Sequence, residues 1–377
     1  MSEYQYYEFV SVDQPLTPAQ QGELRAISTR AQITASSFVN TYQWGDLKAD
    51  PQKLMEHYFD AFLYLTNWGT HRVSLRLPVG LLDPDTATAY CVGESAHCQV
   101  TRTHVILDLH SEDEDGEWQE DGQNSLASIV PVRSELAVGD TRLLYLAWLL
   151  CVQGRQLNDN EAEPPVPPGL GELSGPLRSL ADFLRLDQDL LAAAAESSEP
   201  LAQKRPSAGT LTRWVKSLPE ADKDDVIVRL LHNNDPHLRS ELLRRLHHPT
   251  PQAATGGRSV GELLAAAEGR WAARQQAAQQ RQVAQRARRE QAAAVAREQR
   301  LQALAATEDQ AWRRVDTMIE TKKPKEYAAA VALLEDLRAL SERDGQTAPY
   351  RQRIQLLRQQ HARKPSLLDR LDRARLG

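Results

Sequence analysis

Side chains that can ligate a metal gather in one stretch of this 377-residue chain, between residues 91 and 110. They are Cys91, His97, Cys98, His104, Asp108 and His110. If residues 104 to 110 form a strand, His104, Asp108 and His110 project from one face, where a zinc or iron ion could be held. Structural zinc sites usually show tighter C-x-x-C or H-x3-H spacing. We therefore expect a polar sheet face without metal or cofactor, and keep His97, Cys98, His104 and His110 as the metal candidates.

Two arginines extend this polar surface. Arg72 and Arg76 alternate with apolar residues in a second expected strand and so share one of its faces. With His104, Asp108 and His110 they are the candidate catalytic residues of a hydrolase, which remains one interpretation of this sheet. The sequence suggests no Ser-His-Asp or Cys-His order beyond chance and contains no glycine-rich phosphate loop. We therefore favour a protein that is not an enzyme.

An acidic segment follows the second strand, with seven carboxylates in the ten residues from 112 to 121. Calcium loops place their ligands at defined alternate positions, with a glycine at the turn and a closing glutamate, and this run fits that pattern poorly. We expect a solvated acidic loop. It could also mimic nucleic acid or pair with the chain's own basic C-terminal part.

The elements that must position these residues predict an α+β domain over residues 1–158. Aromatic and β-branched residues from 6 to 12 predict a strand, and a capping box at Thr17 predicts a helix to about residue 31. Asp50 precedes a proline and predicts the start of a second helix. The residues expected on its buried face are Leu54, Tyr58, Phe59, Phe62 and Leu65.

Two segments rich in turn-forming residues divide the middle of the chain. Residues 159–176 contain five prolines and three glycines, which predicts a linker. Residues 177–248 carry leucines at helical spacing and predict a small bundle of short helices. A second linker is expected at 249–258, before a capping box formed by Ser259 and Glu262.

Residues 259–307 predict one long helix, since the chain has neither glycine nor proline from 270 to 323, a stretch that would span roughly 80 Å as helix. Residues 272–300 hold ten alanines and eight glutamines, and their only larger apolar residues are Val283 and Val295. A coiled coil needs apolar positions in every heptad. We therefore favour a solvated single helix, while an alanine seam against another helix remains open.

The long helix is also the best electrostatic feature of the sequence. Arg281, Arg288 and Arg289 lie within about one face of two turns and could contact the phosphates of nucleic acid or a protein partner. Aromatic residues that would stack on bases are missing between them. We favour a solvated face and keep nucleic-acid binding as the alternative.

The last segment, residues 308–377, predicts a compact helical module. Trp312 begins one apolar helix face and Tyr327 begins the next. We expect these two aromatic residues to take part in binding a protein partner.

Composition bounds the class of protein. With 41% hydrophobic residues the chain can bury a core, and its longest apolar run, residues 143–152, is too short to cross a membrane. The N-terminus lacks the pattern of a secretory signal, so we expect a cytoplasmic location. The three cysteines have no close C-x-x-C pair and are expected to be free thiols. Abundant alanine and an excess of arginine over lysine suggest a bacterium with a GC-rich genome.

The net charge of −6 hides an asymmetry between the two ends of the chain. Residues 259–377 carry 23 lysines and arginines against 15 acidic residues, so the first 258 residues sum to about −14. This asymmetry predicts either attraction between the ends or attraction of the basic end to an anionic partner.

Two parts of the chain resemble known groups of proteins. The first runs from Leu24-Arg-Ala-Ile through Trp44-Gly-Asp to Asn67-Trp-Gly-Thr and resembles a group of uncharacterised bacterial proteins, which implies no activity. The second comprises Trp312-x-x-Val, Lys322-Lys-Pro-Lys-Glu-Tyr and His361-Ala-Arg-Lys-Pro-Ser, and resembles the C-terminal tail of bacterial proteins that carry a SWIM-type zinc finger. Together they cover about a third of the chain.

The resemblance to SWIM-type proteins stops short of their zinc site. A SWIM finger has a C-x-C pair followed by C-x-H, and this sequence has neither. The resemblance therefore implies a shared docking or dimerising tail without the zinc. We expect a cytoplasmic, non-enzymatic adaptor or scaffold that binds a protein partner through its C-terminal module and is not in a membrane; its oligomeric state stays open.

Overall fold

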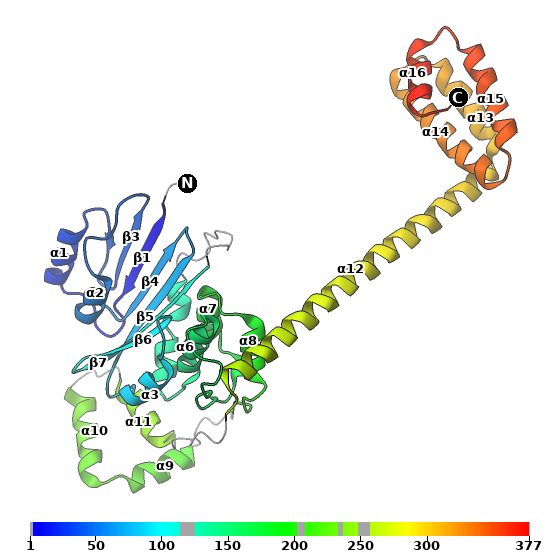
Figure 1. Cartoon of the computed structure of the whole chain (residues 1–377). Helices are drawn as coiled ribbons and strands as arrows, with labels where there is room; N and C mark the ends of the chain where they lie inside the picture. The colour runs from blue at the N-terminus through cyan, green and yellow to red at the C-terminus, as the bar shows by residue number, and fades with distance from the viewer. Residues whose placement is uncertain (1–2, 114–124, 202–207, 233–236, 248–256, 377) are drawn as a thin grey trace. The chain divides into compact units, whose positions relative to one another are not determined.

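The computed structural model describes residues 3–113, 125–201, 208–232, 237–247 and 257–376. The chain divides into two compact units, residues 1–274 and 275–377. The first contains an antiparallel sheet with helices and the second is entirely helical, which confirms the expected α+β domain followed by an all-α region (Figure 1). Within the described residues, no helix is both long enough and apolar enough to cross a membrane.

One seven-stranded antiparallel sheet forms the centre of the first unit, in the order β2-β3-β1-β4-β5-β7-β6. Its strands are β1 (Gln5–Val10), β2 (Gln32–Ile33), β3 (Ser37–Tyr42), β4 (Ala61–Thr66), β5 (Thr70–Pro78), β6 (Ala96–Val100) and β7 (His104–Glu112). Strands β5 and β7 form the longest ladder, from Thr70 opposite Glu112 to Pro78 opposite His104. This ladder fixes the places of Arg72, Arg76, His104, Asp108 and His110.

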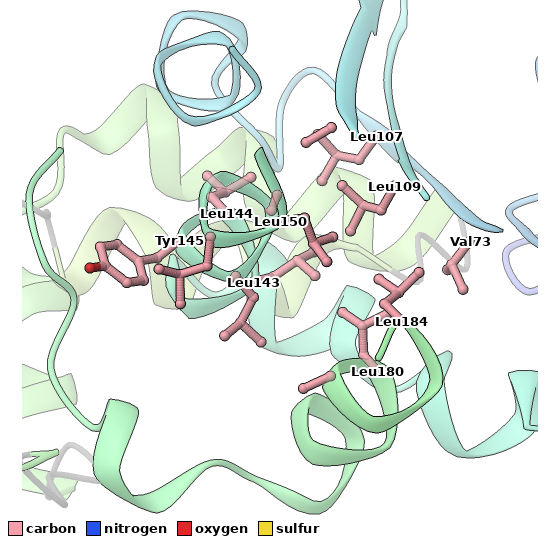
Figure 2. Packing of buried hydrophobic residues seen from close by; sticks show 14 of the residues in the cluster. Val73, Leu107, Leu109, Leu143, Leu144, Tyr145, Leu150, Leu180 and Leu184 are labelled. Carbon is pink, nitrogen blue, oxygen red and sulfur yellow. The ribbon is translucent and has the colours of Figure 1, made fainter. Parts of the chain in front are cut away.

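One face of the sheet is buried beneath helices (Figures 1 and 2). The helices whose residues share this core are α3 (Pro84–Tyr90), α4 (Leu126–Ile129), α5 (Val132–Ala137), α6 (Arg142–Gln153), α7 (Gly175–Phe183), α8 (Gln188–Ala195) and the first turns of α12 (Val260–Ala305). Helix α6 lies at the centre of this core, and all but the last of its twelve residues are buried. Figure 2 shows Leu144 and Leu150 of α6 near Leu107 and Leu109 of β7.

The opposite face is covered at its β1 and β3 side. Helices α1 (Pro18–Ile27) and α2 (Pro51–His57) pack there on a second core that contains Phe9, Phe38 and Phe62. The predicted capping box of α1 is present, since Thr17 and Gln20 bond each other's backbone N–H groups. On β5 and β7 this face instead carries Arg72, Arg76 and other polar residues.

The predicted extension of the second helix to Leu65 is wrong. Helix α2 ends at His57, and Phe62 and Leu65 belong to strand β4. Phe62 packs in the core beneath α1 and α2, whereas Leu65 packs in the core beneath α6. A strand buried on both faces reads as a continuous apolar run, so periodicity does not separate it from a helix.

The segment expected to form a bundle over 177–248 divides between two places. Helices α7 and α8 lie in the core of the sheet domain. The remaining helices, α9 (Ala208–Ser217), α10 (Glu220–His232) and α11 (Leu238–His247), contribute no residue to that core. The sheet domain therefore extends past the linker expected at 159–176. The short 3-10 helix η2 (Leu170–Glu172) lies within this expected linker.

Helix α12 (Val260–Ala305) is the long helix that the sequence predicts, and the Ser259 and Glu262 capping box begins it. Every residue from 271 to 300 is exposed in the single chain. Four further helices follow: α13 (Glu308–Glu320), α14 (Pro324–Arg343), α15 (Thr347–Gln360) and α16 (Pro365–Arg373). They share one core, which also contains Leu301 at the end of α12.

Candidate functional site

The polar residues of β5 and β7 make ion pairs with their neighbours. The guanidinium of Arg72 donates two hydrogen bonds to the Asp108 carboxylate, from Nε at 2.8 Å and from Nη2 at 2.5 Å. Ser74 donates a third to Asp108 at 2.9 Å. These bonds raise the pKa of Arg72. Both predicted catalytic residues of this pair are therefore occupied by each other.

Arg76 belongs to a second, more deeply buried network. It donates to Asp60 at 2.8 Å and to the carbonyls of Met55 and Glu56 at 2.9 and 2.8 Å. Asp60 is 1% exposed and also accepts the backbone N–H groups of residues 12 and 13. This saturation makes Arg76 a structural residue that joins α2 to the sheet.

Arg133 of α5 completes the network from the other side. It donates to both carboxylate oxygens of Asp13, at 3.0 and 2.8 Å, and its Nε donates to the carbonyl of Arg76. His237, just before α11, lies 3.0 Å from Asp13. Burial opposes ionisation of Asp13, but hydrogen bonds from His237 and Arg133 outweigh it and lower the pKa of that carboxyl. Asp13, Asp60 and Arg133 are separated in sequence and carry no motif, so sequence reasoning missed them.

The metal candidates do not converge. His97 pairs with Asp108 across the sheet, whereas Cys98 pairs with Leu107 and faces the opposite core. His104 and His110 are six residues apart on one strand, which places them about 20 Å from each other. Among the described residues, no group of three or more His, Cys, Asp or Glu side chains is placed to hold a metal ion.

His104 and the acidic segment add no chemistry to this face. The imidazole of His104 bonds Thr103 at 2.8 Å, and burial together with the charge of Arg76 lowers its pKa. Of the acidic run at 112–121, only Glu112 and Asp113 lie inside the described residues. The two arginines of the polar face, Arg72 and Arg76, are thus both engaged in ion pairs.

A cavity of the first unit lies elsewhere, around His71 at the start of β5. It has a volume of about 750 Å³. Its lining comes from β5, α4, α7, the start of α8 and Arg274, and comprises His71, Asp113, Ser125, Ser128, Ser179, Asp182, Phe183, Arg185, Leu186, Asp187, Gln188 and Arg274. Pockets that hold small molecules usually have volumes of about 300 to 1,000 Å³. Of the residues that line this cavity, the sequence analysis considered only Asp113, as part of the acidic segment.

One hydrogen bond and one ring contact hold the imidazole of His71 in this cavity. Its Nδ1 lies 3.0 Å from the carbonyl of Gly69, and its ring packs edge-on against Phe183 at 5.3 Å between centroids. Burial lowers the pKa of His71, which favours the neutral ring. In that tautomer Nδ1–H donates to Gly69 and Nε2 is an acceptor.

The loop between α7 and α8 is held by α6. The side chain of Gln153 donates to the carbonyl of Arg185 and accepts from the backbone N–H of Asp187, at 3.0 and 2.8 Å. Asp187 caps α8, and Arg274 pairs with the buried Asp189 at 2.5 Å. The cavity wall is therefore built on the core of the sheet domain.

In the C-terminal unit, two smaller cavities of about 160 and 230 Å³ lie along α14 and α15. Ser341 and Tyr350 line both, so the two cavities are neighbours, and we call them together the α14–α15 groove. Its first part is lined by Glu308, Trp312, Leu340, Ser341, Asp344, Gln346, Pro349, Tyr350 and Arg353. Its second part is lined by Arg338, Ser341, Glu342, Thr347, Tyr350, Arg351, Ile354, Arg375 and Leu376.

Trp312 and Tyr327, the two aromatic residues expected to take part in partner binding, are both buried in the single chain. Trp312 is 3% and Tyr327 6% exposed, because both lie in the core shared by α13 to α16. Trp312 reaches a partner only through the first part of the groove, where Arg353 stacks over its ring at 4.4 Å. Apolar periodicity identified the core of the module and not its surface.

The arginines of α12 are exposed as expected. Arg281, Arg288 and Arg289 make no ion pair or side-chain hydrogen bond within the described residues. Their neighbour Arg286 pairs with Glu290 one turn later at 2.8 Å. These arginines remain accessible to an anionic partner.

Apolar side chains are exposed on α10. Leu230 and Leu231 are 68% and 78% exposed, and Ile227 and Val228 are more than half exposed. Contiguous exposed apolar residues of this kind are typical of protein interaction surfaces.

Comparison of the chain with models of known families, with curated proteins and with solved structures found no match.

Proposed function

We propose that this protein is a non-enzymatic adaptor of the cytoplasm, and that its C-terminal unit binds an acidic peptide segment of a protein partner in the α14–α15 groove. The observation that carries the proposal is the pair of guanidinium groups of Arg351 and Arg375, which line the second part of this groove and make no ion pair or side-chain hydrogen bond within the described residues. Arg338 also lines it, but its guanidinium is engaged by Glu342 and by the carbonyls of residues 374 and 375. Glu342 is the only acidic residue among the described residues that line it. Carboxylates of a partner would pair with Arg351 and Arg375.

The neighbouring first part of the groove supports a peptide rather than an isolated anion. Its lining includes the ring of Trp312 beside Leu340 and Pro349, which suits an apolar side chain. Tyr350 lies between the two parts, and its hydroxyl donates to the carbonyl of Leu334 at 2.8 Å. A bound peptide would therefore place an apolar residue in the first part of the α14–α15 groove and an acidic residue in the second part.

One observation favours a protein partner over nucleic acid. The exposed leucines of α10 offer apolar surface, which phosphate does not use. The exposed arginines of α12 support nucleic acid as the second candidate. The cytoplasmic location is supported by Cys91, Cys98 and Cys151, all free thiols, as is usual in reducing compartments.

A binding experiment on the full chain separates these functions. The probes are a glutamate-rich peptide with one central leucine, the same peptide with lysine in place of glutamate, and a 30-nucleotide single-stranded DNA. The Arg351→Glu and Arg375→Glu double variant should weaken binding of the acidic peptide by about tenfold or more. The matched control Arg289→Glu, on the exposed face of α12, should not. Equal binding of both peptides, or DNA binding that only Arg289→Glu reduces, overturns the proposal.

A further inference from the structure

We infer that the cavity around His71 is a binding site for a small zwitterion, an amino acid or a short peptide with free ends. This inference concerns the first unit and does not depend on the partner proposed for the α14–α15 groove. The cavity has a volume of about 750 Å³, which is enough for a molecule of a few residues. Its class of ligand follows from the charges around it.

Charged groups of both signs line the cavity without neutralising each other. The side chains of Arg185, Asp113 and Asp182 make no ion pair or side-chain hydrogen bond within the described residues. Arg274 also lines the cavity, but it forms an ion pair with Asp189. The carboxylate of Asp187 lines it too, but it accepts hydrogen bonds from backbone N–H groups at the N-terminus of α8. A bound ligand is therefore offered one unpaired guanidinium and two unpaired carboxylates.

A zwitterion satisfies this set better than other small ions. Its carboxylate would accept hydrogen bonds from Arg185, and its ammonium would donate to Asp113 or Asp182. A nucleotide or other polyanion would meet three aspartates against two arginines, and a polycation would meet both arginines. A ligand whose charges are all positive or all negative is thus disfavoured.

The remaining lining explains how the ligand would be oriented. Phe183 and Leu186 supply an apolar wall for a side chain, and Phe183 also holds the His71 ring edge-on. The neutral imidazole has Nδ1 engaged by Gly69, so Nε2 remains an acceptor for a ligand N–H.

The chain supplies a matched pair of variants for the test. Arg185 and Arg155 both have positive φ, 53° and 54°, a conformation that asparagine tolerates. Arg185 lines the cavity, whereas Arg155 is exposed, pairs with Glu268 and is not among its lining residues. Arg185→Asn therefore removes the proposed carboxylate partner, and Arg155→Asn controls for the backbone change.

Saturation-transfer NMR on the full chain would use a pool of alanine-X dipeptides with free ends. The same pool, acetylated and amidated, and AMP are the comparison ligands. We expect the free pool to bind, the blocked pool and AMP to bind at least tenfold more weakly, and Arg185→Asn alone to reduce binding by about tenfold or more. The site is not a zwitterion site if the free pool fails to bind at millimolar concentration. Equal binding of blocked peptides, tighter binding of AMP, or equal loss in Arg155→Asn overturns it as well.

Discussion

The buried carboxylate of Glu163 accepts two hydrogen bonds from the guanidinium of Arg258, each 3.0 Å long. Tyr145 of α6 donates to the same carboxylate, and the backbone N–H of Glu163 donates to the carbonyl of Arg258 at 2.8 Å. Arg258 also donates to the carbonyl of Ala193 in α8. The pair of Glu163 and Arg258 therefore fixes the chain just before α12 to the core of the sheet domain.

Arg258→Met should destabilise the first unit by about 3 to 5 kcal/mol, because it leaves the Glu163 charge buried without its partner. Urea titration of the full chain measures this loss. The double variant Glu163→Met with Arg258→Met should lose less, since no unpaired charge remains. Glu268→Gln, which breaks only the exposed pair with Arg155, should change stability by less than about 1 kcal/mol. A loss of the same size in Glu268→Gln would contradict the role given to the buried pair.

The contact between Asp13 and Arg133 predicts a pH dependence at the acidic end. The pKa of Asp13 is lower in the folded chain than its ordinary value of 3.8. Its contribution to the stability of the folded chain is therefore complete above about pH 4 and is lost as the pH falls through the folded pKa. Asp13→Asn should cost about 3 kcal/mol at pH 7, and the difference from the wild type should shrink below pH 4. Urea titrations at pH 7, 4 and 3 measure it, with Asp85→Asn on the surface of α3 as control. A difference that stays constant over this range would exclude Asp13 as the titrating group.

The sequence predicted the fold class because it rests on local signals. Capping boxes at Thr17 and Ser259 begin α1 and α12 as expected, and alternation identified β5 and β7. Strand β4 was misassigned since both of its faces are buried. Local patterns succeed where one face of an element meets water and fail where neither does.

The sites could not be predicted because their residues meet only in the folded chain. Arg72 and Asp108 lie diagonally across the β5–β7 ladder, where Arg72 is opposite His110 and Asp108 is opposite Ser74, and their ion pair neutralises both. The cavity joins His71 to Arg185, which is 114 residues later in the sequence, and neither residue carries a motif. Periodicity likewise marked Trp312 as important but does not separate a core aromatic from a contact residue.

The imidazole of His71 predicts a second pH dependence, near neutral pH. Burial lowers its pKa from the ordinary value of 6.5, Arg185 lowers it further, and the Gly69 carbonyl and Asp113 oppose the shift. The unfolded chain therefore binds the proton more readily, and stability should fall as the pH decreases from about 6.5 through the folded pKa. His71→Asn retains an N–H donor for Gly69 and should remove this part of the dependence. A proton NMR titration of His71 that reports a pKa of 6.5 or higher would contradict the expected direction.

Trp312 tests whether the C-terminal unit has a core of its own. Its side chain is buried among α13, α14 and α15, and the core to which it belongs contains no residue of the sheet domain. Trp312→Ala should destabilise the C-terminal unit by about 3 to 5 kcal/mol, because it removes a large buried aromatic side chain and leaves a cavity. Calorimetry of the full chain should show one transition shifted to lower temperature and the transition of the sheet domain unchanged. Trp271→Ala, at a tryptophan that is 52% exposed on α12, should shift neither transition appreciably. If Trp312→Ala lowers both transitions together, the two cores do not unfold independently, and the α14–α15 groove must then be studied as part of a single cooperative structure.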